Sequence, residues 1–413
     1  MSTLQYDVII FGATSFVGQI LCKYIADNFN AEGKETLRWA IAGRSKGKLE
    51  EVKQRLGLNE ITALVADASD ESALRDLCIQ TRVVVSTVGP YALYGEVLVK
   101  MCAENGTDYC DLTGEVQWIY AMLNKYEQSA KKSGARIVHS CGFDSIPSDL
   151  GVYFTQQHAK QSQGEYCQNI KMRVKAAKGG ASGGTIASMV NITKEAAKDP
   201  VLRKQLANPY LICPEDAGYS TRQFNTNKPT WDADFSAWTA PFVMAGINTR
   251  IVFRSNALGG SEYGTDFTYD EAMLMGESWK GCLGAAAMVA GLGVFLLGVS
   301  LKPSRYLLER YILPKPGAGP TPQEQVDGYY DLRFVGETPS GKTVSTKVTG
   351  QGDPGYGSTG KMLGQAAACL ALDFYKGEKK TGKGGGFWTP ASIFGEKLVG
   401  RLVEHADVTF EVL

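Results

Sequence analysis

The chain has 413 residues, 44% of them hydrophobic, and its 43 lysine and arginine residues balance 43 aspartate and glutamate residues. This length and apolar content allow a sizeable buried core and predict two domains. The balanced charge, with no long run of one sign, excludes the electrostatic pattern of a nucleic-acid-binding protein.

The cysteines and histidines narrow the class of protein further. Nine cysteines are scattered along the chain without a C-x-x-C pair, and there are only three histidines. This pattern is typical of reduced, buried thiols and predicts neither a disulfide framework nor a metal site. The first apolar segment is too short for a signal peptide, so we expect a cytoplasmic protein.

The first predicted elements are a strand and a helix joined by a glycine turn. Residues 8–11 form an apolar run typical of a strand buried in a parallel sheet, Gly12 ends it, and a helical pattern follows from Val17. Small residues let the backbone approach a ligand here, and the first amides of the helix attract negative charge. We expect the pyrophosphate of a dinucleotide at this turn; the alternative is a tight connection without a ligand. The residues predicted to contact it are Gly12, Ala13, Thr14, Ser15, Phe16, Val17 and Gly18.

Charged residues follow the second predicted strand, residues 37–42. An NAD site usually has a carboxylate here that binds the ribose hydroxyls, whereas this chain has Arg44, then Ser45 and Lys48. A guanidinium and an ammonium group suit a 2′-phosphate, which predicts NADP(H) as the cofactor. The alternative is that Arg44 and Lys48 are ordinary solvated charges.

Two more strands bring residues to the same edge of the sheet. After a predicted helix at 46–56 come strands at 61–65 and 82–88. Asp67 follows the first of them and either lies near the adenine side of the cofactor or caps a helix that begins near residue 71. Ligands of parallel sheets bind at the carboxyl edge. We therefore expect the residues at the end of the strand at 82–88 to lie on the nicotinamide side: Thr87, Val88, Gly89 and Pro90.

Helices at 95–105 and 117–133 and a strand at 136–140 complete the first domain, predicted at residues 1–150. Strands and helices alternating at this spacing predict a Rossmann-type, doubly wound parallel sheet of the α/β class. The polar segment after the last strand contains Cys141 and Gly142, which we expect to line the cofactor site. Ser148 or Asp149 in the same segment is suited to capping the next helix.

Several motifs resemble the saccharopine dehydrogenase-like oxidoreductase family, which includes the trans-acting enoyl reductases of bacterial lipid biosynthesis. They are GATSFVG, VGPYALYGE, DYCDLTGE and CGFDSIPSDLG in the first domain, and SGGTIASM, GDPGYGSTGKML and TPASIFGEKLVGRL beyond it. The resemblance covers nearly the whole chain. It departs at Ser15, where relatives commonly have glycine, and serine cannot adopt strongly left-handed angles without strain.

The second predicted domain, residues 151–355, is of the α+β class. Strands are expected at 170–176, 248–255, 329–336 and 342–349, with a helix that opens at residues 183–185. Thr185 either caps that helix or donates to a substrate oxygen. Residues 356–413 are predicted to form carboxyl-terminal helices, at 361–375 and 390–405, that return to the first domain, with a flexible link at 382–386.

The least ordinary segment is residues 281–301, which contain no charge. Its length meets the threshold for a membrane span, but motifs of the same domain resume beyond it, which argues against a single crossing. We expect residues 281–313 to associate with a membrane or lipid surface from one side, with Arg305 and Arg310 at the headgroups. The alternative is a buried helix that forms a homodimer.

No acid–base set stands out in the sequence. A Ser/Tyr-x-x-x-Lys arrangement does not follow the fourth or fifth predicted strand, so the candidate proton donors are Tyr91, Tyr94, Asp144 and Ser145. The first hypothesis is an NADP(H)-dependent oxidoreductase that transfers hydride to an apolar, lipid-type substrate such as an enoyl group. The alternatives are a membrane-associated NADP(H)-binding scaffold or sensor with little turnover, and a C–N oxidoreductase of amino acids.

Overall fold

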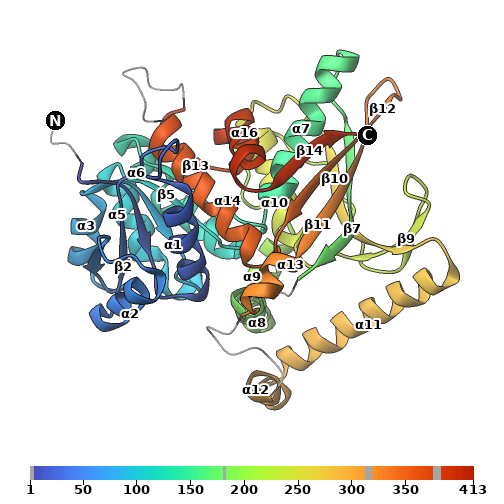
Figure 1. Cartoon of the computed structure of the whole chain (residues 1–413). Helices are drawn as coiled ribbons and strands as arrows, with labels where there is room; N and C mark the ends of the chain where they lie inside the picture. The colour runs from blue at the N-terminus through green and yellow to red at the C-terminus, as the bar shows by residue number, and fades with distance from the viewer. Residues whose placement is uncertain (1–3, 180–182, 312–318, 375–382) are drawn as a thin grey trace. The chain divides into compact units, whose positions relative to one another are not determined.

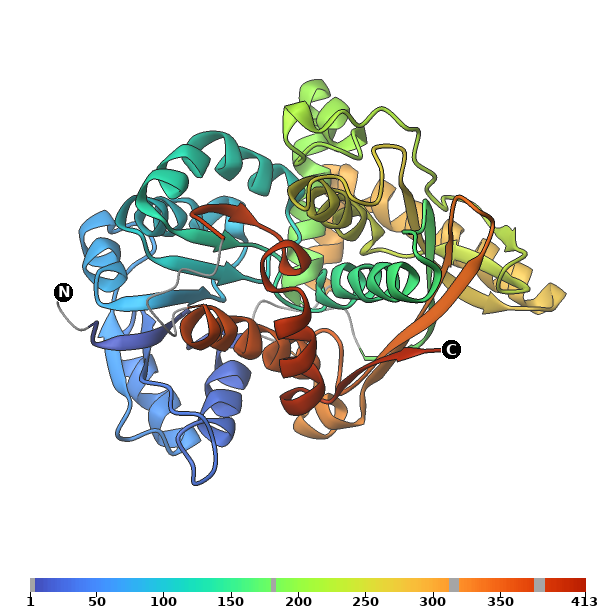
Figure 2. The ribbon, with the colours of Figure 1, turned by 90° about the horizontal axis from the view of Figure 1, so that it is seen from above.

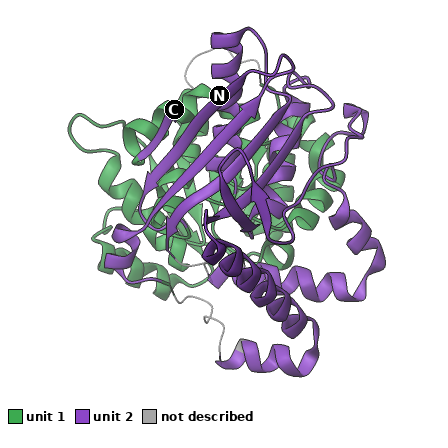
Figure 3. Cartoon of the chain, turned by 90° about the vertical axis from the view of Figure 1, so that its right-hand side faces the viewer, with its two compact units in different colours: residues 1–144, 317–319, 355–407 green, residues 145–316, 320–354, 408–413 purple. Residues whose placement is uncertain are grey.

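The computed structural model describes residues 4–179, 183–311, 319–374 and 383–413. The chain forms two compact units (Figure 3). The first contains residues 1–144, 317–319 and 355–407, and the second contains residues 145–316, 320–354 and 408–413. The chain therefore leaves the first unit after Asp144 and comes back to it for most of its last 59 residues.

The first unit is built on a seven-stranded parallel sheet in the order β13-β6-β5-β4-β1-β2-β3 (Figure 1). Read from β3, the first six strands have the Rossmann order 3-2-1-4-5-6, in which β1 and β4 flank the switch point where ligands bind. The strands are β1 (Tyr6–Phe11), β2 (Trp39–Gly43), β3 (Thr62–Val65), β4 (Thr81–Ser86), β5 (Asp108–Asp111), β6 (Arg136–Val138) and β13 (Gly386–Trp388).

Helices cover both faces of this sheet (Figure 2). On one face α1 packs against α14, and on the other α5 packs between α3 and α6. The helices are α1 (Phe16–Asn28), α2 (Lys46–Leu56), α3 (Glu71–Cys78), α4 (Tyr91–Tyr94), α5 (Glu96–Asn105), α6 (Val116–Ser133), α14 (Gly357–Ala368), α15 (Pro390–Phe394) and α16 (Glu396–His405). The Rossmann-type prediction is confirmed.

Two strands of the first unit were not predicted. β5 has the sequence DYCD, whose two carboxylates obscure a strand that is fully buried. Each carboxylate has partners: Arg136 bonds to Asp108, and His139 Nδ1 lies 2.7 Å from Asp111 Oδ2. β13 is only three residues long and comes from the end of the chain, so no local pattern marks it.

Close helix packing holds the carboxyl-terminal helices in the first unit. A Cβ atom on Gly360 would lie 2.8 Å from Ile20 Cγ2, and one on Gly364 would lie 2.7 Å from the Tyr24 ring. The predicted helix at 361–375 is α14 followed by a π-helical turn, Cys369–Asp373, and residue 375 lies outside the described residues. The predicted helix at 390–405 is two helices separated by Gly395. Most of the predicted link at 382–386 is described, and its last residue begins β13.

The second unit contains a mixed seven-stranded sheet in the order β14-β12-β11-β7-β10-β9-β8. Only β7 and β10 pair in parallel; the other neighbours are antiparallel. The strands are β7 (Asn169–Lys178), β8 (Thr230–Asp232), β9 (Ala237–Pro241), β10 (Thr268–Gly276), β11 (Tyr329–Glu337), β12 (Thr343–Gln351) and β14 (Val408–Val412). The helices are α7 (Ile146–Gln163), α8 (Gly183–Lys198), α9 (Pro200–Ala207), α10 (Ala245–Leu258), α11 (Trp279–Ser300), α12 (Lys302–Tyr311) and α13 (Pro322–Asp327), with a 3₁₀ turn at Glu215–Ala217.

The prediction of a strand at 248–255 is wrong, because this segment forms most of α10. The segment is rich in β-branched residues, but residues 247–249 and 251–256 are all buried, so the segment has no solvent-facing side. Its polar residues have partners inside the unit: Asn248 donates to Glu271, and Ser255 donates to Asp149. Tertiary packing therefore overrides the local preference.

Candidate cofactor site

The glycine turn after β1 is shaped by close backbone contacts. Gly12 has φ +93°, and a Cβ atom there would lie 2.6 Å from Val88 Cγ2. A Cβ atom on Gly18 would lie 2.3 Å from the Gly12 carbonyl oxygen. The Thr87 hydroxyl donates to that same oxygen at 3.0 Å. Only glycine fits at positions 12 and 18, and the turn is held against the end of β4.

The structure explains how serine is accommodated at position 15, where the resembled family commonly has glycine. It is the N-cap of α1, with φ −70° and ψ 162°, and its Oγ accepts from Gly18 N at 2.9 Å. The same Oγ lies 3.0 Å from Thr87 Oγ1. The backbone is extended at this position, so a serine introduces no strain. The amides of Phe16 and Val17 in the first turn of α1 have no partner within the helix, and such amides attract phosphate.

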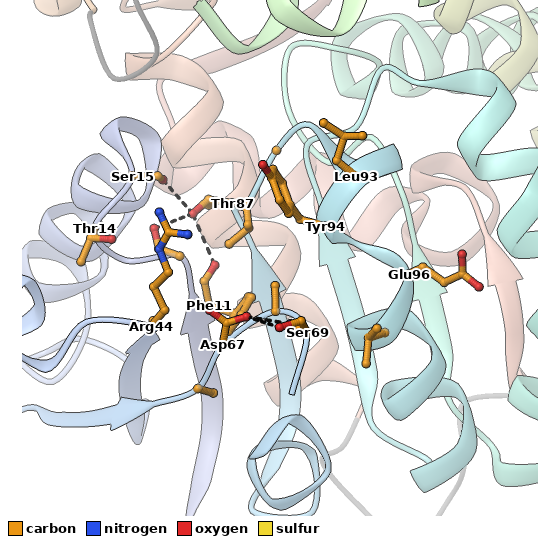
Figure 4. A pocket seen from close by; sticks show the side chains of 17 residues that line it. Phe11, Thr14, Ser15, Arg44, Asp67, Ser69, Thr87, Leu93, Tyr94 and Glu96 are labelled. Atoms are coloured by element: carbon orange, nitrogen blue, oxygen red, sulfur yellow. Dashed lines mark hydrogen bonds between the residues drawn. The ribbon is translucent and has the colours of Figure 1, made fainter. Parts of the chain in front are cut away.

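A cavity of about 480 Å³ opens beside this turn at the carboxyl ends of β1 to β4 (Figure 4). It lies at the switch point of the sheet, where a dinucleotide binds in this fold. The absence of side chains at the glycines of the turn lets a pyrophosphate come close to the backbone, whereas larger residues would block it. Its lining residues are Phe11, Gly12, Thr14, Ser15, Gly43, Arg44, Ala66, Asp67, Ala68, Ser69, Thr87, Val88, Gly89, Leu93, Tyr94, Glu96 and Val97.

The two basic residues that were predicted to bind a 2′-phosphate, Arg44 and Lys48, lie differently with respect to the cavity. Arg44 is exposed and lines the cavity, which fits a 2′-phosphate. Ser45 is the N-cap of α2 and accepts from Lys48 N at 3.4 Å. Lys48 is exposed on the first turn of α2 and does not line the cavity. The geometry thus favours Arg44 as the phosphate ligand.

Asp67 also lines the cavity and does not cap a helix. Asp70 is the N-cap of α3, so the alternative reading of Asp67 as that cap is wrong. Asp67 Oδ1 instead accepts from the Ser69 hydroxyl at 2.6 Å and from Ser69 N at 2.9 Å. These bonds, with the nearby Arg44, lower the pKa of Asp67. An ionised carboxylate here suits hydrogen bonding to the adenosine part of a cofactor.

Tyr91 and Tyr94 have different environments although both belong to α4. Tyr94 is 49% exposed and lines the cavity with Leu93 and Val97. Tyr91 is buried, and its hydroxyl donates to Ser86 O at 3.0 Å and accepts from Leu112 N at 3.2 Å. Burial raises the pKa of Tyr91 well above its usual value, and the nearby Asp111 adds to this shift.

Asp144 and Ser145 are adjacent but belong to different units. Burial raises the pKa of Asp144 to about 7, and Asp111 adds to the shift. A Cβ atom on Gly142 would lie 3.2 Å from Asp144 Oδ2 and 2.7 Å from a Leu112 methyl group, so this loop packs tightly. A carboxyl group with this pKa is partly protonated at neutral pH and can donate a proton.

Ser145 begins the second unit and is part of a buried polar cluster. Its Oγ donates to Asn248 Oδ1 at 3.0 Å, and Asn248 Nδ2 donates to Ser148 Oγ at 3.1 Å and to Glu271 at 2.9 Å. Tyr269 donates to Glu271 at 2.7 Å, and burial raises the pKa of Glu271 to about 7. Sequence reasoning missed Asn248 and Glu271 because their partners lie on other elements.

Two further residues hold the loops at the carboxyl edge. Asp111 accepts from Thr113 N at 3.0 Å and from Ser140 N at 3.1 Å, and Glu115 accepts from Tyr91 N at 2.9 Å. Cys141 is fully buried and its amide donates to the Asp111 carbonyl, so its thiol is not a lining group. The motif DYCDLTGE contained both acidic residues, but spacing alone did not reveal their role. Among the described residues, no group of three His, Cys, Asp or Glu side chains is arranged for a metal.

Comparison with known proteins decides the family. Residues 8–138 match the model of the saccharopine dehydrogenase NADP binding domain. A Mycobacterium tuberculosis protein whose name proposes a trans-acting enoyl reductase is 38% identical over 409 residues, which cover 96% of this chain and 95% of that protein. The chain belongs to the saccharopine dehydrogenase-like oxidoreductase family. The trans-acting enoyl reductase of Mycobacterium ulcerans is 34% identical over 420 residues, covering 98% of this chain and 97% of its own.

A solved structure agrees at the level of the fold. Saccharopine dehydrogenase (L-Glu forming) from Saccharomyces cerevisiae matches with a TM-score of 0.52 at 13% identity, over 99% of this chain and 100% of that one. Membership of the saccharopine dehydrogenase-like family makes the protein an oxidoreductase with an NADP-binding domain. The predictions of family and of NADP(H) are therefore confirmed.

Proposed function

We propose that the protein is an NADP(H)-dependent reductase of an enoyl group carried by a lipid chain. The observation that carries the proposal is the similarity, over 95% or more of each chain, to proteins named as trans-acting enoyl reductases. The cavity supports it, because the glycine turn and Arg44 fit the phosphates of NADP(H). The yeast saccharopine dehydrogenase supports only the fold, so an amino-acid substrate has no comparable support.

The chemistry divides between the cofactor and the chain. Bound NADPH supplies a hydride, which forms a C–H bond at the β-carbon as the C=C π bond breaks. The chain must supply a proton to the α-carbon, and we infer that Asp144 is the donor because its pKa of about 7 keeps a fraction of it protonated. The Tyr91 hydroxyl is engaged by backbone groups and Ser145 is bonded to Asn248, whereas Tyr94 lines the cavity and is the second candidate.

We also propose that residues 281–313 contact a membrane or lipid surface from which an apolar substrate comes. The most apolar 18-residue window of Trp279–Ser300 has a mean hydropathy of 2.3, and 11% of that window is buried, whereas the core helix of a globular protein is mostly buried. Residues 312 and 313 lie outside the described residues, so the argument rests on 279–311. A reductase of lipid chains gains access to its substrate by this contact.

The test is NADPH consumption by the purified full chain. A long-chain trans-enoyl thioester should be reduced, while its saturated counterpart, as the control, should leave NADPH unchanged. Tight NADPH binding without turnover on enoyl, other lipid or oxo-acid substrates would contradict the reductase and identify a scaffold or sensor. Turnover with an oxo acid and lysine alone would identify a C–N oxidoreductase.

A further inference from the structure

The exposed surface of α11 is apolar on more than one side. Residues 281–299 contain no charged residue, and Val294 and Leu296 are 71% and 37% exposed. Positions two apart on a helix with 3.6 residues per turn are rotated by about 200°, so these two side chains lie on nearly opposite sides. A single protein surface covers one side of a helix. Hydrocarbon covers all of them, and a helix that is apolar all round is typical of a lipid environment.

The ends of this helix have residues that are typical of a membrane interface. Trp279 is 68% exposed at one end and is followed by Lys280. At the other end the chain changes direction into α12 (Figure 1), and the Gly298 carbonyl accepts from Ser304 Oγ at 2.6 Å. Aromatic rings and cations favour the headgroup level, so both ends of α11 are suited to that level.

The charges on α12 favour anionic lipids. Its sequence carries Lys302, Arg305 and Arg310 against a single acidic residue, Glu309. The Arg310 guanidinium lies 5.9 Å from the ring centre of Tyr306 and 5.6 Å from that of Tyr311, and both rings are more than half exposed. Each basic residue near an anionic surface strengthens binding by about fivefold.

The topology of the second sheet and the described helices after α11 argue against a crossing. β10 precedes α11 and β11 follows α13, and both strands pair with β7. The chain must therefore come back to the side from which it left. A return crossing requires a helix of about 20 residues. The described helices between α11 and β11 are α12, with ten residues, and α13, with six. A non-helical segment exposed to lipid cannot cross, because its backbone polar groups would have no partners.

We propose that α11 and α12 insert into one leaflet of an anionic membrane without crossing it. This inference rests on the proposed membrane contact and adds the charge of the lipid and the one-sided insertion. α11 lies in the acyl region, and α12 lies at the headgroups with its cations toward the lipid phosphates.

Vesicle flotation of the full chain tests the lipid. We expect binding to vesicles of phosphatidylcholine with phosphatidylglycerol, and binding to pure phosphatidylcholine that is weaker by tenfold or more. Val294→Asp should weaken binding by about a hundredfold, because it places a charge in the acyl region. The matched control is Val326→Asp in α13, since Val326 is also 71% exposed. Exchanging Lys302 and Arg310 for glutamine should weaken binding to anionic vesicles by about thirtyfold and leave neutral vesicles nearly unaffected.

A thiol reagent that cannot cross membranes tests the insertion. Tyr311→Cys should react equally in intact and detergent-opened vesicles, after subtraction of the unmodified chain. Protection that ends only with detergent would place α12 inside the vesicle and overturn the inference. A chain that ignores all vesicles and forms a dimer abolished by Val294→Asp would overturn it in favour of a second copy. Because NADPH consumption is measured separately, failure of this inference is distinguishable from failure of the reductase.

Discussion

The glycines of the cofactor turn and the two glycines in the middle of α11, Gly291 and Gly293, have opposite surroundings. A Cβ atom on Gly12 or Gly18 would meet other atoms within 3 Å, whereas one on Gly291 or Gly293 would meet nothing within 4 Å. In the turn, glycine is required because the backbone comes close to neighbouring atoms. At Gly291 and Gly293 the chain itself imposes no such requirement. A glycine therefore indicates a ligand-binding turn only where neighbouring atoms leave no room for a side chain.

The largest effect should come from Gly18→Ala. The added Cβ would lie 2.3 Å from the Gly12 carbonyl oxygen, a backbone atom that cannot move without opening the turn. NADPH binding should become undetectable in a calorimetric titration, while vesicle binding by α11 should remain. NADPH affinity equal to that of the unmodified chain would break the comparison, because the turn would then not require glycine.

Asp144→Asn should lower kcat by about 10²- to 10⁴-fold, the range typical of a lost general acid. NADPH affinity should change little, because Asp144 does not line the cavity. Steady-state kinetics and a separate NADPH titration distinguish the two effects. A variant with full kcat would remove Asp144 from the mechanism and return the proton-donor role to the other candidates.

The pH dependence sharpens the same point. The rate should be constant at low pH and fall as pH rises through about 7, because the protonated carboxyl is the donor. Folding stability should also fall as pH rises from about 4 to about 7, because the folded state holds this proton more tightly than the unfolded state. Thermal unfolding of Asp144→Asn, measured over the same range, should show a smaller decline.

Arg44→Ala should weaken NADPH binding by about 5- to 150-fold, the loss expected for hydrogen bonds to a charged group. NADH affinity should change much less, because NADH has no 2′-phosphate. Lys48→Ala is the control, since Lys48 is exposed nearby without lining the cavity. Equal losses for NADPH and NADH would contradict the assignment of Arg44.

The smallest effect should come from Gly291→Ala. Nothing lies within 4 Å of the added methyl group, and alanine in a helix interior is more favourable than glycine by about 0.5–1 kcal/mol. We expect unchanged NADPH binding and a slightly higher Tm. A clear loss of stability would show that α11 is more closely packed than its exposure indicates.

Sequence reasoning succeeded where a structure depends on neighbours along the chain. α2 has its predicted bounds, and the turn from Gly12 to Gly18 lies between β1 and α1 as expected. It failed where distant partners decide. β5 was not predicted and α10 was predicted as a strand, because Arg136 and Glu271, which satisfy Asp108 and Asn248 in the interior, lie on other elements.

The different surroundings of Tyr91 and Tyr94 could not be read from the sequence either. Both tyrosines of α4 follow β4, and spacing alone made them equal candidates for the proton donor. The structure separates them: the Tyr91 ring, at the start of α4, is buried, whereas Tyr94, at its end, lines the cavity. Such a distinction depends on helix orientation, which packing sets.

The most direct test of the account follows hydrogen from the cofactor to the substrate. The full chain is incubated with a long-chain trans-enoyl thioester and NADPH carrying deuterium at the transferring position of C4, and the lipid product is examined by mass spectrometry. The account predicts a saturated product with deuterium at its β-carbon, and none with Gly18→Ala. A chain that binds NADPH tightly but transfers no deuterium to the lipid would contradict it.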